Sequence, residues 1–396
     1  MVNPYICYAI SFGAALLLYP LAWSELYPDL THSLLLFLVV TIILNVILAI
    51  RWSVKNKFFF KNVSPENRSA PLYLTIFIYT LWSAEFLYND GVPLLKIILQ
   101  QRYDYKLFGI PKLHVFVVTF SSFYTIFLFQ IYLSKKSGFI LALYLLNLFA
   151  ALLIYNRGML FFNITASAFL YLMYKRTISF KKLALASIFF ICLFYFFGVL
   201  GSLRVTNESR KGYSNEEFLD TGKASAAFRN SIIPSEFFWS YIYSTSPIAN
   251  LQNNVNVYQP QPTTFYSILH WLNNEVLFDF ISKRINSFTG SVREGENTIP
   301  GPFNASTVYS RSFSYLGWPG LILMGIVIIL MPVIFLRVLP ASSPFFSTGL
   351  AIVNIIFLFM VFDNTLRFTG LSFQLAYPVL LHYSSSHLPW LKKLFI

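Results

Sequence analysis

Charged residues are scarce in this chain of 396 residues, where Asp, Glu, Lys and Arg together make up only 11%. Soluble globular domains carry about 25% charged residues, so this sequence lacks the polar side chains that would cover a water-exposed surface. Hydrophobic residues make up 56% and aromatic residues 19% of the chain. The composition excludes an ordinary soluble enzyme and predicts an integral membrane protein, with Phe and Tyr facing lipid and the interfaces.

Cysteine is nearly absent, and several familiar catalytic motifs are missing. Cys7 and Cys192 lie in apolar stretches without a spaced framework, so we expect neither a structural disulfide nor a cysteine metal site. The sequence has no P-loop, no H-E-x-x-H zinc helix and no G-x-S-x-G elbow. It also lacks the D-x-D type of acidic cluster that holds a divalent metal. We therefore expect a function that needs no metal and no cofactor.

Long apolar runs are abundant instead, and a bilayer core needs about 20 apolar residues per helix. The runs predict an all-α polytopic membrane protein with about ten transmembrane helices. Their expected bounds are 4–24, 32–50, 71–88, 113–133, 138–155, 158–174, 182–201, 317–336, 346–362 and 368–384.

The net charge of +13 is concentrated after alternate spans. The basic residues in question are Arg51, Lys55, Lys57, Lys61, Arg68, Lys135, Lys136, Lys175, Arg176, Lys181, Lys182, Arg337, Lys392 and Lys393. The positive-inside rule places these loops, and with them both termini, in the cytoplasm. The opposite side is electrically balanced, so the basic charge predicts topology and not a nucleic-acid partner.

Two long segments face outward, about 89–112 and about 202–316. The chain then divides into a first membrane bundle (1–201, spans one to seven), a large periplasmic loop (202–316) and a second bundle (317–396, spans eight to ten). The loop is predicted to be partly helical, with helical patterns after Ser214, after Pro234 and over 264–286, and irregular coil over 287–312. The apolar stripe of 264–286 is typical either of a helix in the membrane interface or of one packed on the loop's own core.

Arg157 is the most informative charge in the outer half of the chain. It lies between two spans whose other ends are cytoplasmic, so it cannot serve as a positive-inside anchor. One interpretation is an arginine at a tight turn whose side chain extends to the interface. The other is a guanidinium that binds a phosphate, because its planar fork pairs bidentately with such oxygens. Gly158 beside it would let the backbone approach a ligand.

Further arginines occupy the outer segments. Arg204 follows the seventh span by three residues and Arg311 precedes the eighth, so both are expected at the outer rim. Arg367 lies beside Asp363, and either an ion pair between them or a ligand contact accounts for it. The remaining loop arginines are Arg210, Arg229, Arg284 and Arg293, and Arg210 is expected to be a solvated charge. We expect Arg293 to be a solvated charge.

Three residues are candidates for proton transfer: Glu85, His114 and, in the long loop, His270. Glu85 is the one acid predicted well inside a span, and a carboxylate at that depth either pairs with an arginine or titrates near neutrality. His114, at the outer start of the fourth span, is an alternative base. A single histidine is more often structural, so both interpretations stay open here.

Several segments together resemble a known family. EFLYNDGVPLL (85–95) is followed by YKLFGIPKLH (105–114), and this pair resembles the outer-loop signature of the bacterial O-antigen polymerase (Wzy) family. YNRGML (155–160) resembles its arginine-glycine element, YIYSTSPIANL (241–251) its large-loop segment, and FNASTVYSRSFSYLGWPG (303–320) its loop exit. The chain departs from the family at Ser314, where an Asp is expected before the aromatic-glycine pair. The paired arginine spacing of some relatives' periplasmic loops is not evident either.

The resemblance implies a glycosyltransferase of the inner membrane, similar in plan to the metal-independent GT-C-like enzymes. It would polymerise oligosaccharide repeat units carried on undecaprenyl diphosphate, at the periplasmic side of the bacterial membrane. Its partners would be the lipid-linked donor and acceptor, membrane lipid, and chain-length regulator and flippase proteins, but no nucleic acid. An O-antigen ligase and a flippase or other transporter of the same lipids are the alternatives.

The resemblance and the charge pattern together give a hypothesis about the site. Arg157 and Arg204 would bind the diphosphate, while Glu85 or His114 would orient or deprotonate the acceptor hydroxyl. Further substrate contacts are expected from Arg229, Arg311, Arg284, Tyr243, Asn250 and Arg367.

Overall fold

The computed structural model describes residues 2–55, 60–99, 101, 108–175, 195, 216–388 and 395. Within these ranges the regular structure is helical, apart from one isolated antiparallel bridge between Ser24 and Ala224. The helices at the positions of the expected spans are α1 (Pro4–Leu18), α2 (His32–Lys55), α3 (Ala70–Tyr88), α5 (Leu113–Lys135), α6 (Gly138–Leu153), α7 (Arg157–Lys175), α15 (Trp318–Val338), α16 (Phe346–Phe359) and α18 (Ala376–His387). The other helices are η1 (Tyr19–Leu21), α4 (Pro93–Ile98), α9 (Glu216–Thr221), α10 (Ala226–Arg229), α11 (Phe237–Val257), α12 (Phe265–Trp271), η2 (Leu272–Val276), α13 (Asp279–Thr289), α14 (Ser310–Leu316), α17 (Thr369–Ser372) and η3 (Phe373–Leu375).

Five of the described helices are long and apolar enough to cross a membrane. They cover Pro4–Leu21, His32–Trp52, Ala70–Tyr88, Leu113–Lys135 and Trp318–Val338. The helices α6 and α16 are apolar but shorter. The remaining expected spans coincide with α7 and with α17, η3 and α18 together, while the span expected at 182–201 lies outside the described residues. The prediction of an all-helical membrane protein is confirmed, and the full set of spans stays a prediction.

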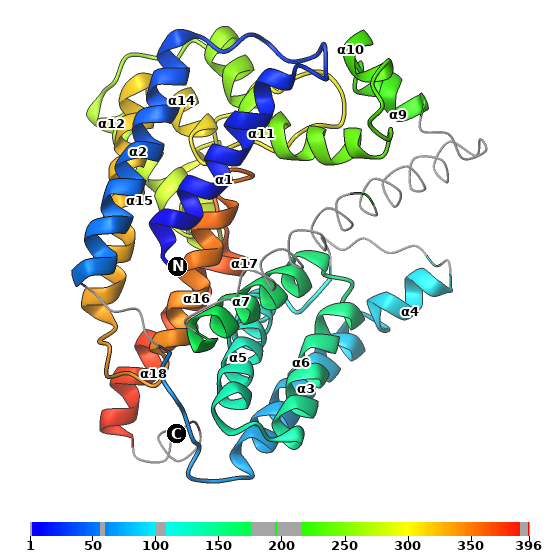
Figure 1. The fold of residues 1–396 in the computed structure, drawn as a ribbon. Helices are drawn as coiled ribbons and strands as arrows, with labels where there is room; N and C mark the ends of the chain where they lie inside the picture. The colour runs from blue at the N-terminus through cyan, green and yellow to red at the C-terminus, as the bar shows by residue number, and fades with distance from the viewer. Residues whose placement is uncertain are drawn as a thin grey trace.

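The helices from the two ends of the chain pack together around α16, which lies against α1, α5 and α7 (Figure 1). Polar side chains between these apolar helices bond to one another, as membrane interiors require. Asn354 on α16 accepts a hydrogen bond from the Cys7 thiol of α1 at 3.3 Å, and Ser122 of α5 bonds to Asn163 of α7. Near the C-terminal ends of the same two helices, the Lys136 ammonium lies 4.3 Å from the centre of the Tyr174 ring, so α5 and α7 run in parallel and begin at the same end of the bundle.

The segment 216–316 gathers at one end of the molecule and packs over α1 (Figure 1). Its longest helix, α11, is fixed to the α1 end by the Tyr241 hydroxyl, which accepts from the Trp23 backbone at 3.2 Å. The helical pattern over 264–286 is realised as α12, the π-helical turn η2 and α13. Leu277 ends the π turn in an extended conformation, which breaks what the sequence predicts as one helix. Part of the expected coil at 287–312 is helical as well, because α13 continues to Thr289.

Candidate functional site

The C-terminal end of α3 and the N-terminal end of α5 bring Glu85 and His114 together. The His114 Nδ1 lies 2.9 Å from the Glu85 Oε2, with the carboxylate fully buried and the imidazole 30% exposed. The imidazole edge also contacts the rings of Trp82 and Phe108. The sequence predicts an arginine partner or a titrating acid at Glu85, and the structure provides a histidine instead. A buried acid behind a solvent-accessible imidazole is an arrangement that orients a general base.

Gly109 is required for this contact. Its φ of +103° lies in a region that side chains rarely adopt, and a Cβ there would come within 2.3 Å of the His114 Cγ. The close approach of the backbone lets the imidazole lie over Gly109 and reach Glu85. The glycine of the F-G-I-P motif is therefore explained by this contact, because a side chain at position 109 would displace the His114 imidazole.

A second contact joins the two segments 85–95 and 105–114. The Asn89 side chain accepts a hydrogen bond from the Gly109 backbone N–H at 3.3 Å and donates one to the Glu85 carbonyl at 2.7 Å. Lys96 of α4 donates to the Asn89 carbonyl at 2.6 Å, near the C-terminal end of α3. The hydrogen bond between Asn89 and Gly109 thus links the turn after α3 to the turn before α5, and both turns position the Glu85–His114 pair.

A second polar cluster is centred on Glu275, which is fully buried in the π turn η2. Its Oε1 accepts from the Arg293 Nε at 2.9 Å, and its Oε2 accepts from the Asn364 side chain at 3.0 Å. Burial raises the pKa of the Glu275 carboxyl, and the charge of Arg293 opposes that rise. The expectation of a solvated Arg293 is therefore wrong: the side chain is only 22% exposed and neutralises a buried acid.

Glu275 and Arg293 were missed by sequence reasoning, although a signal for the acid exists. Glu275 stands inside an apolar helical pattern, as Glu85 does, and the cost of burying a carboxylate applies equally to both. Its partners come from positions 18 and 89 residues away. No spacing rule connects such positions, so only the folded chain reveals the pairing.

Arg367 and Arg311 lie in the same cluster. Arg367 pairs with Asp279 at the start of α13 at 2.5 Å, and its expected ion pair with Asp363 is not the one that forms. Burial, followed by the nearby charge of Arg293, lowers the pKa of the Arg367 guanidinium. The buried Nε of Arg367 has no hydrogen-bond partner among the described residues. Arg311 is 29% exposed and pairs with Glu296 at 3.0 Å.

Aromatic side chains connect the arginine cluster to the end of α5 that carries His114. The Phe116 ring of α5 lies 6.5 Å from that of Phe280 on α13 and 5.7 Å from that of Phe373 on η3. Phe280 directly follows Asp279, the partner of Arg367. The acid–histidine pair and the buried arginines therefore lie at the same end of the bundle.

Arg157, the first residue of α7, lies at this end too. One turn further along α7, the Phe162 ring lies 6.3 Å from that of Phe368, the residue after Arg367. The Arg157 side chain is exposed, and its guanidinium contacts both the hydroxyl and the ring face of Tyr155. It makes no ion pair with a described residue, so its charge faces outward. Arg204 and Arg210 lie outside the described residues.

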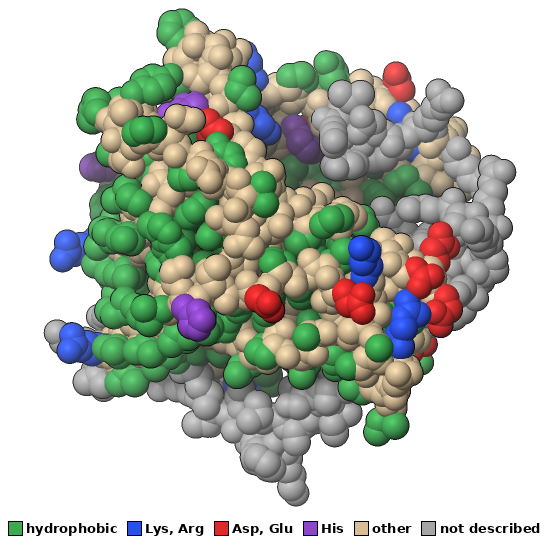
Figure 2. Space-filling model, turned by 90° about the horizontal axis from the view of Figure 1, so that it is seen from above, with side chains coloured by type: hydrophobic (Ala, Val, Ile, Leu, Met, Phe, Trp, Pro, Cys, Tyr) green, Lys and Arg blue, Asp and Glu red, His purple; other side chains and the backbone are tan. Residues whose placement is uncertain are grey.

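Other expected substrate contacts are engaged within the protein. Arg229 pairs with Glu216 at 2.9 Å and with Asp220 at 2.5 Å, and Arg284 packs over its own helix at Phe280. Both arginines therefore make contacts within the protein at the surface of the loop. Figure 2 shows acidic and basic side chains intermixed at one edge of the same end of the molecule.

Asn250 and Tyr243 both lie on α11, with different surroundings. The Asn250 amide is buried, donates to the Phe303 and Ala305 carbonyls at 2.6 Å each, and accepts from the Ile299 N–H at 2.8 Å. This network uses both amide hydrogens and the oxygen, so Asn250 clamps the loop instead of facing a substrate as the sequence led us to expect. Tyr243 is partly exposed and stacks on Trp239.

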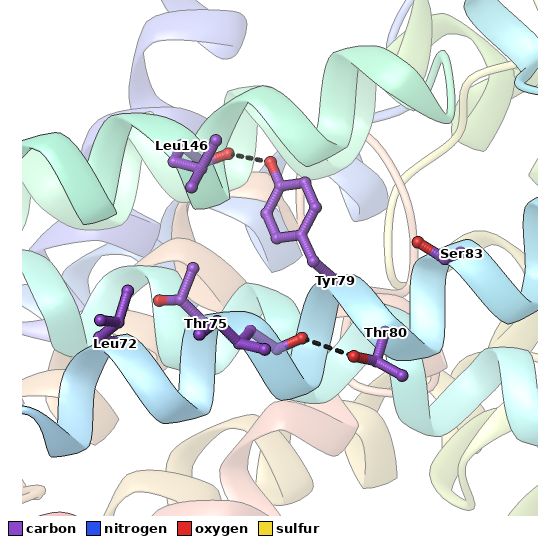
Figure 3. A pocket seen from close by; sticks show the side chains of 7 residues that line it. Leu72, Thr75, Tyr79, Thr80, Ser83 and Leu146 are labelled. Carbon is purple, nitrogen blue, oxygen red and sulfur yellow. Dashed lines mark hydrogen bonds between the residues drawn. The ribbon is translucent and has the colours of Figure 1, made fainter.

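A groove of about 410 Å³ lies elsewhere, between α3 and α6 on the side of the bundle (Figure 3). Two of the hydroxyls that line it bond to backbone carbonyls: Tyr79 donates to the Leu146 carbonyl at 2.6 Å and Thr80 to the Ile76 carbonyl at 3.0 Å. The groove thus presents hydrocarbon, and it lacks the charged groups of the acid–histidine and arginine clusters. Among the described residues, no group of three or more His, Cys, Asp or Glu could hold a metal ion.

Comparison of the chain with protein-family models, curated proteins and solved structures finds no match. The site therefore has to be interpreted from its own geometry.

Proposed function

We propose that this chain is a membrane glycosyltransferase that joins oligosaccharide repeat units carried on undecaprenyl diphosphate into O-antigen or a related surface polysaccharide. The observation that carries the proposal is the buried Glu85 carboxylate bound to the partly exposed His114. The resemblance of the two segments that contain these residues to the polymerase family supports it. The proposal includes ten spans, cytoplasmic termini and an active side that faces the periplasm.

His114 acts in the proposed reaction as the general base. Glu85 accepts the hydrogen bond of the imidazole Nδ1–H, which leaves Nε2 free to take the proton of the acceptor hydroxyl. The hydroxyl oxygen attacks the anomeric carbon of the donor glycan, and the bond from that carbon to the diphosphate oxygen breaks. Undecaprenyl diphosphate leaves with the electron pair. General-base catalysis of this kind contributes about 10²- to 10⁴-fold to the rate.

Arginines stabilise the negative charge that develops on the leaving diphosphate. Arg157 faces outward with no acid partner among the described residues, and Arg311 is partly exposed. The buried Arg367 Nε hydrogen has no acceptor among the described residues, and an unpaired buried donor costs about 1–3 kcal/mol, which an oxyanion would recover. These three arginines form the proposed diphosphate site, together with Arg204 on sequence grounds.

The test uses the purified protein in nanodiscs with a defined lipid-diphosphate oligosaccharide, and scores the product by length. A product ladder is expected, and it should persist when a chelator is added. His114→Gln and Arg157→Ala should each abolish the ladder, while the matched control His32→Gln, at the exposed start of α2, should retain it. Long products from the Arg157→Ala protein would contradict the diphosphate assignment.

Two further outcomes would replace the proposal. Transfer of one finished glycan to a lipid A core acceptor, without a ladder, would identify a ligase. Movement of the intact lipid-linked oligosaccharide across a vesicle membrane, without any new glycosidic bond, would identify a transporter.

A further inference from the structure

An exposed apolar surface runs along α12 and α13. We call it the apolar patch, and its exposed side chains are Phe265, Tyr266, Leu269, Leu272, Leu277, Ile285, Phe288 and Val292. Phe288 is 93% exposed and Phe265 77% exposed. The first four members follow one face of a helix. The sequence left open whether the stripe over 264–286 packs on the loop's own core, and the structure divides it: Ile268 and Val276 pack against the core, while the members of the apolar patch are exposed.

The position of α12 is set by α14, which leads directly into a membrane helix. Trp271 at the end of α12 is buried, and its indole N–H donates to the Ser312 hydroxyl at 3.0 Å. After α14, Gly317 connects to α15 at Trp318, where a candidate membrane span begins. Pro260, just before α12, lies so close to Gly317 that a Cβ there would be 3.0 Å from its ring. The α12 segment is therefore at the membrane boundary of α15.

The position of α13 is set by the turn that follows α16. The Asp279 backbone N–H donates to the Arg367 carbonyl at 3.0 Å, and the side chains of the same two residues form an ion pair. Both helices of the patch are thus attached where membrane helices begin or end. Figure 1 draws α12 on the same side of the molecule as α2 and α15, and Figure 2 shows hydrophobic side chains gathered along that side.

The charges of α13 fit an anionic surface. Lys283 is 72% exposed even though it pairs with Asp279, and Arg284 is exposed beside Ile285. Helices that lie in a membrane interface combine an apolar face with Lys and Arg, which reach toward lipid phosphates. A protein partner would have to compete with the lipid that surrounds the neighbouring α15, so lipid is the occupant that the position favours.

We propose that the apolar patch rests on the surface of the bilayer that α2 and α15 cross, with Lys283 and Arg284 among the lipid phosphates. This proposal does not depend on the proposed glycosyltransferase activity. It does have a consequence for the arginine cluster, because Asp279 joins α13 to Arg367. The depth at which α13 rests in the interface then sets the depth of Arg367, close to the level of lipid headgroups.

The test places a fluorescent amino acid at position 288 of the full-length protein in nanodiscs. Quenching by lipids brominated in the acyl chains should be strong there, within about twofold of the quenching at Ile322, an exposed position of α15. A label at Ile232, a fully exposed position between α10 and α11, should be quenched little by brominated lipid and strongly by aqueous iodide. A second label, placed at position 265, should show the same quenching as the label at 288, which would rule out a local effect of the substitution at 288.

A second experiment tests the role of Lys283 and Arg284 by comparing nanodiscs of anionic phosphatidylglycerol with nanodiscs of zwitterionic phosphatidylcholine. The double variant Lys283→Gln/Arg284→Gln should lower the quenching at 288 in phosphatidylglycerol and leave it unchanged in phosphatidylcholine. The proposal is overturned if the labels at 288 and 265 behave like the label at 232. Protection of both labels from brominated lipid and from iodide would also overturn it, since that would mean a protein surface covers the patch.

Discussion

The contact between Glu85 and His114 makes a quantitative prediction about folding stability. Glu85 is fully buried, its Oε1 has no hydrogen-bond partner among the described residues, and its Oε2 is bound by His114. Replacing His114 by Ala therefore leaves both oxygens of a buried carboxyl without a partner. Removing one member of a buried charge pair costs about 3–5 kcal/mol, and leaving a neutral polar group unpaired costs about 1–3 kcal/mol. We expect a loss of about 3 kcal/mol in the free energy of unfolding.

Removing the acid as well should restore part of this loss. In the double variant Glu85→Leu/His114→Ala no polar group remains unpaired at this position, and replacing both partners by apolar groups is close to neutral. The double variant should therefore be more stable than His114→Ala alone, with a coupling energy of about 1–3 kcal/mol between the two positions. Additive losses are expected only if the side chains do not interact.

The assay is a reversible denaturant titration in mixed micelles, followed by circular dichroism. His32→Ala serves as the matched control, because His32 is an exposed histidine at the start of α2. We expect the control to change the free energy of unfolding by less than about 0.5 kcal/mol, as surface substitutions do. Equal effects of His32→Ala and His114→Ala, or a double variant less stable than His114→Ala, would refute the reasoning.

Three further predictions follow from single positions. Gly109→Ala should displace the His114 imidazole and reduce turnover as strongly as His114→Ala, whereas Gly138→Ala, whose Cβ would meet nothing within 4 Å, should have no effect on the product ladder. Asp279→Asn should cost about 2–4 kcal/mol of unfolding free energy, because it removes the partner of the mostly buried Arg367, and Glu216→Gln, an exposed partner of Arg229, should cost under about 1 kcal/mol in the same titration. The raised pKa of Glu275 means that the folded protein holds this proton to higher pH than the unfolded chain, so the stability linked to the group is present at low pH and is lost as pH rises through the raised value. Thermal unfolding between about pH 4 and pH 8 should show the wild type losing stability relative to Glu275→Gln as pH rises, and a difference independent of pH would contradict this.

The helices of this protein could be predicted from its sequence to a large extent. Apolar runs of membrane length specify helices wherever backbone groups cannot bond to water, and the described structure has a helix at each such run. The amphipathic helix expected in the large loop over 264–286 is not continuous, since the chain breaks at Leu277 after a π turn that contains Glu275. The buried bonds of Glu275 to Arg293 and Asn364 accompany that break, and no local pattern encodes them.

Residue chemistry identified several members of the candidate site, because a charge in an apolar segment is costly wherever the chain places it. Glu85, His114, Arg157 and Arg367 are recognisable on that ground alone. Their partners are not, as Arg367 shows by pairing with Asp279 and not with its neighbour Asp363. Which charged residues pair depends on the distance in space between side chains that are far apart in the sequence, and only tertiary packing determines that distance.

The apolar composition by itself predicted a membrane protein, and the apolar runs predicted most of the described helices, since transfer into lipid depends on composition over each span. The tertiary structure decided which of the few charges meet. Glu85 and His114 are 29 residues apart, and they touch because Gly109 adopts a backbone conformation that leaves room for the imidazole and because Asn89 joins the two turns. Such a contact depends on the three-dimensional path of the backbone, which hydrophobicity alone does not specify.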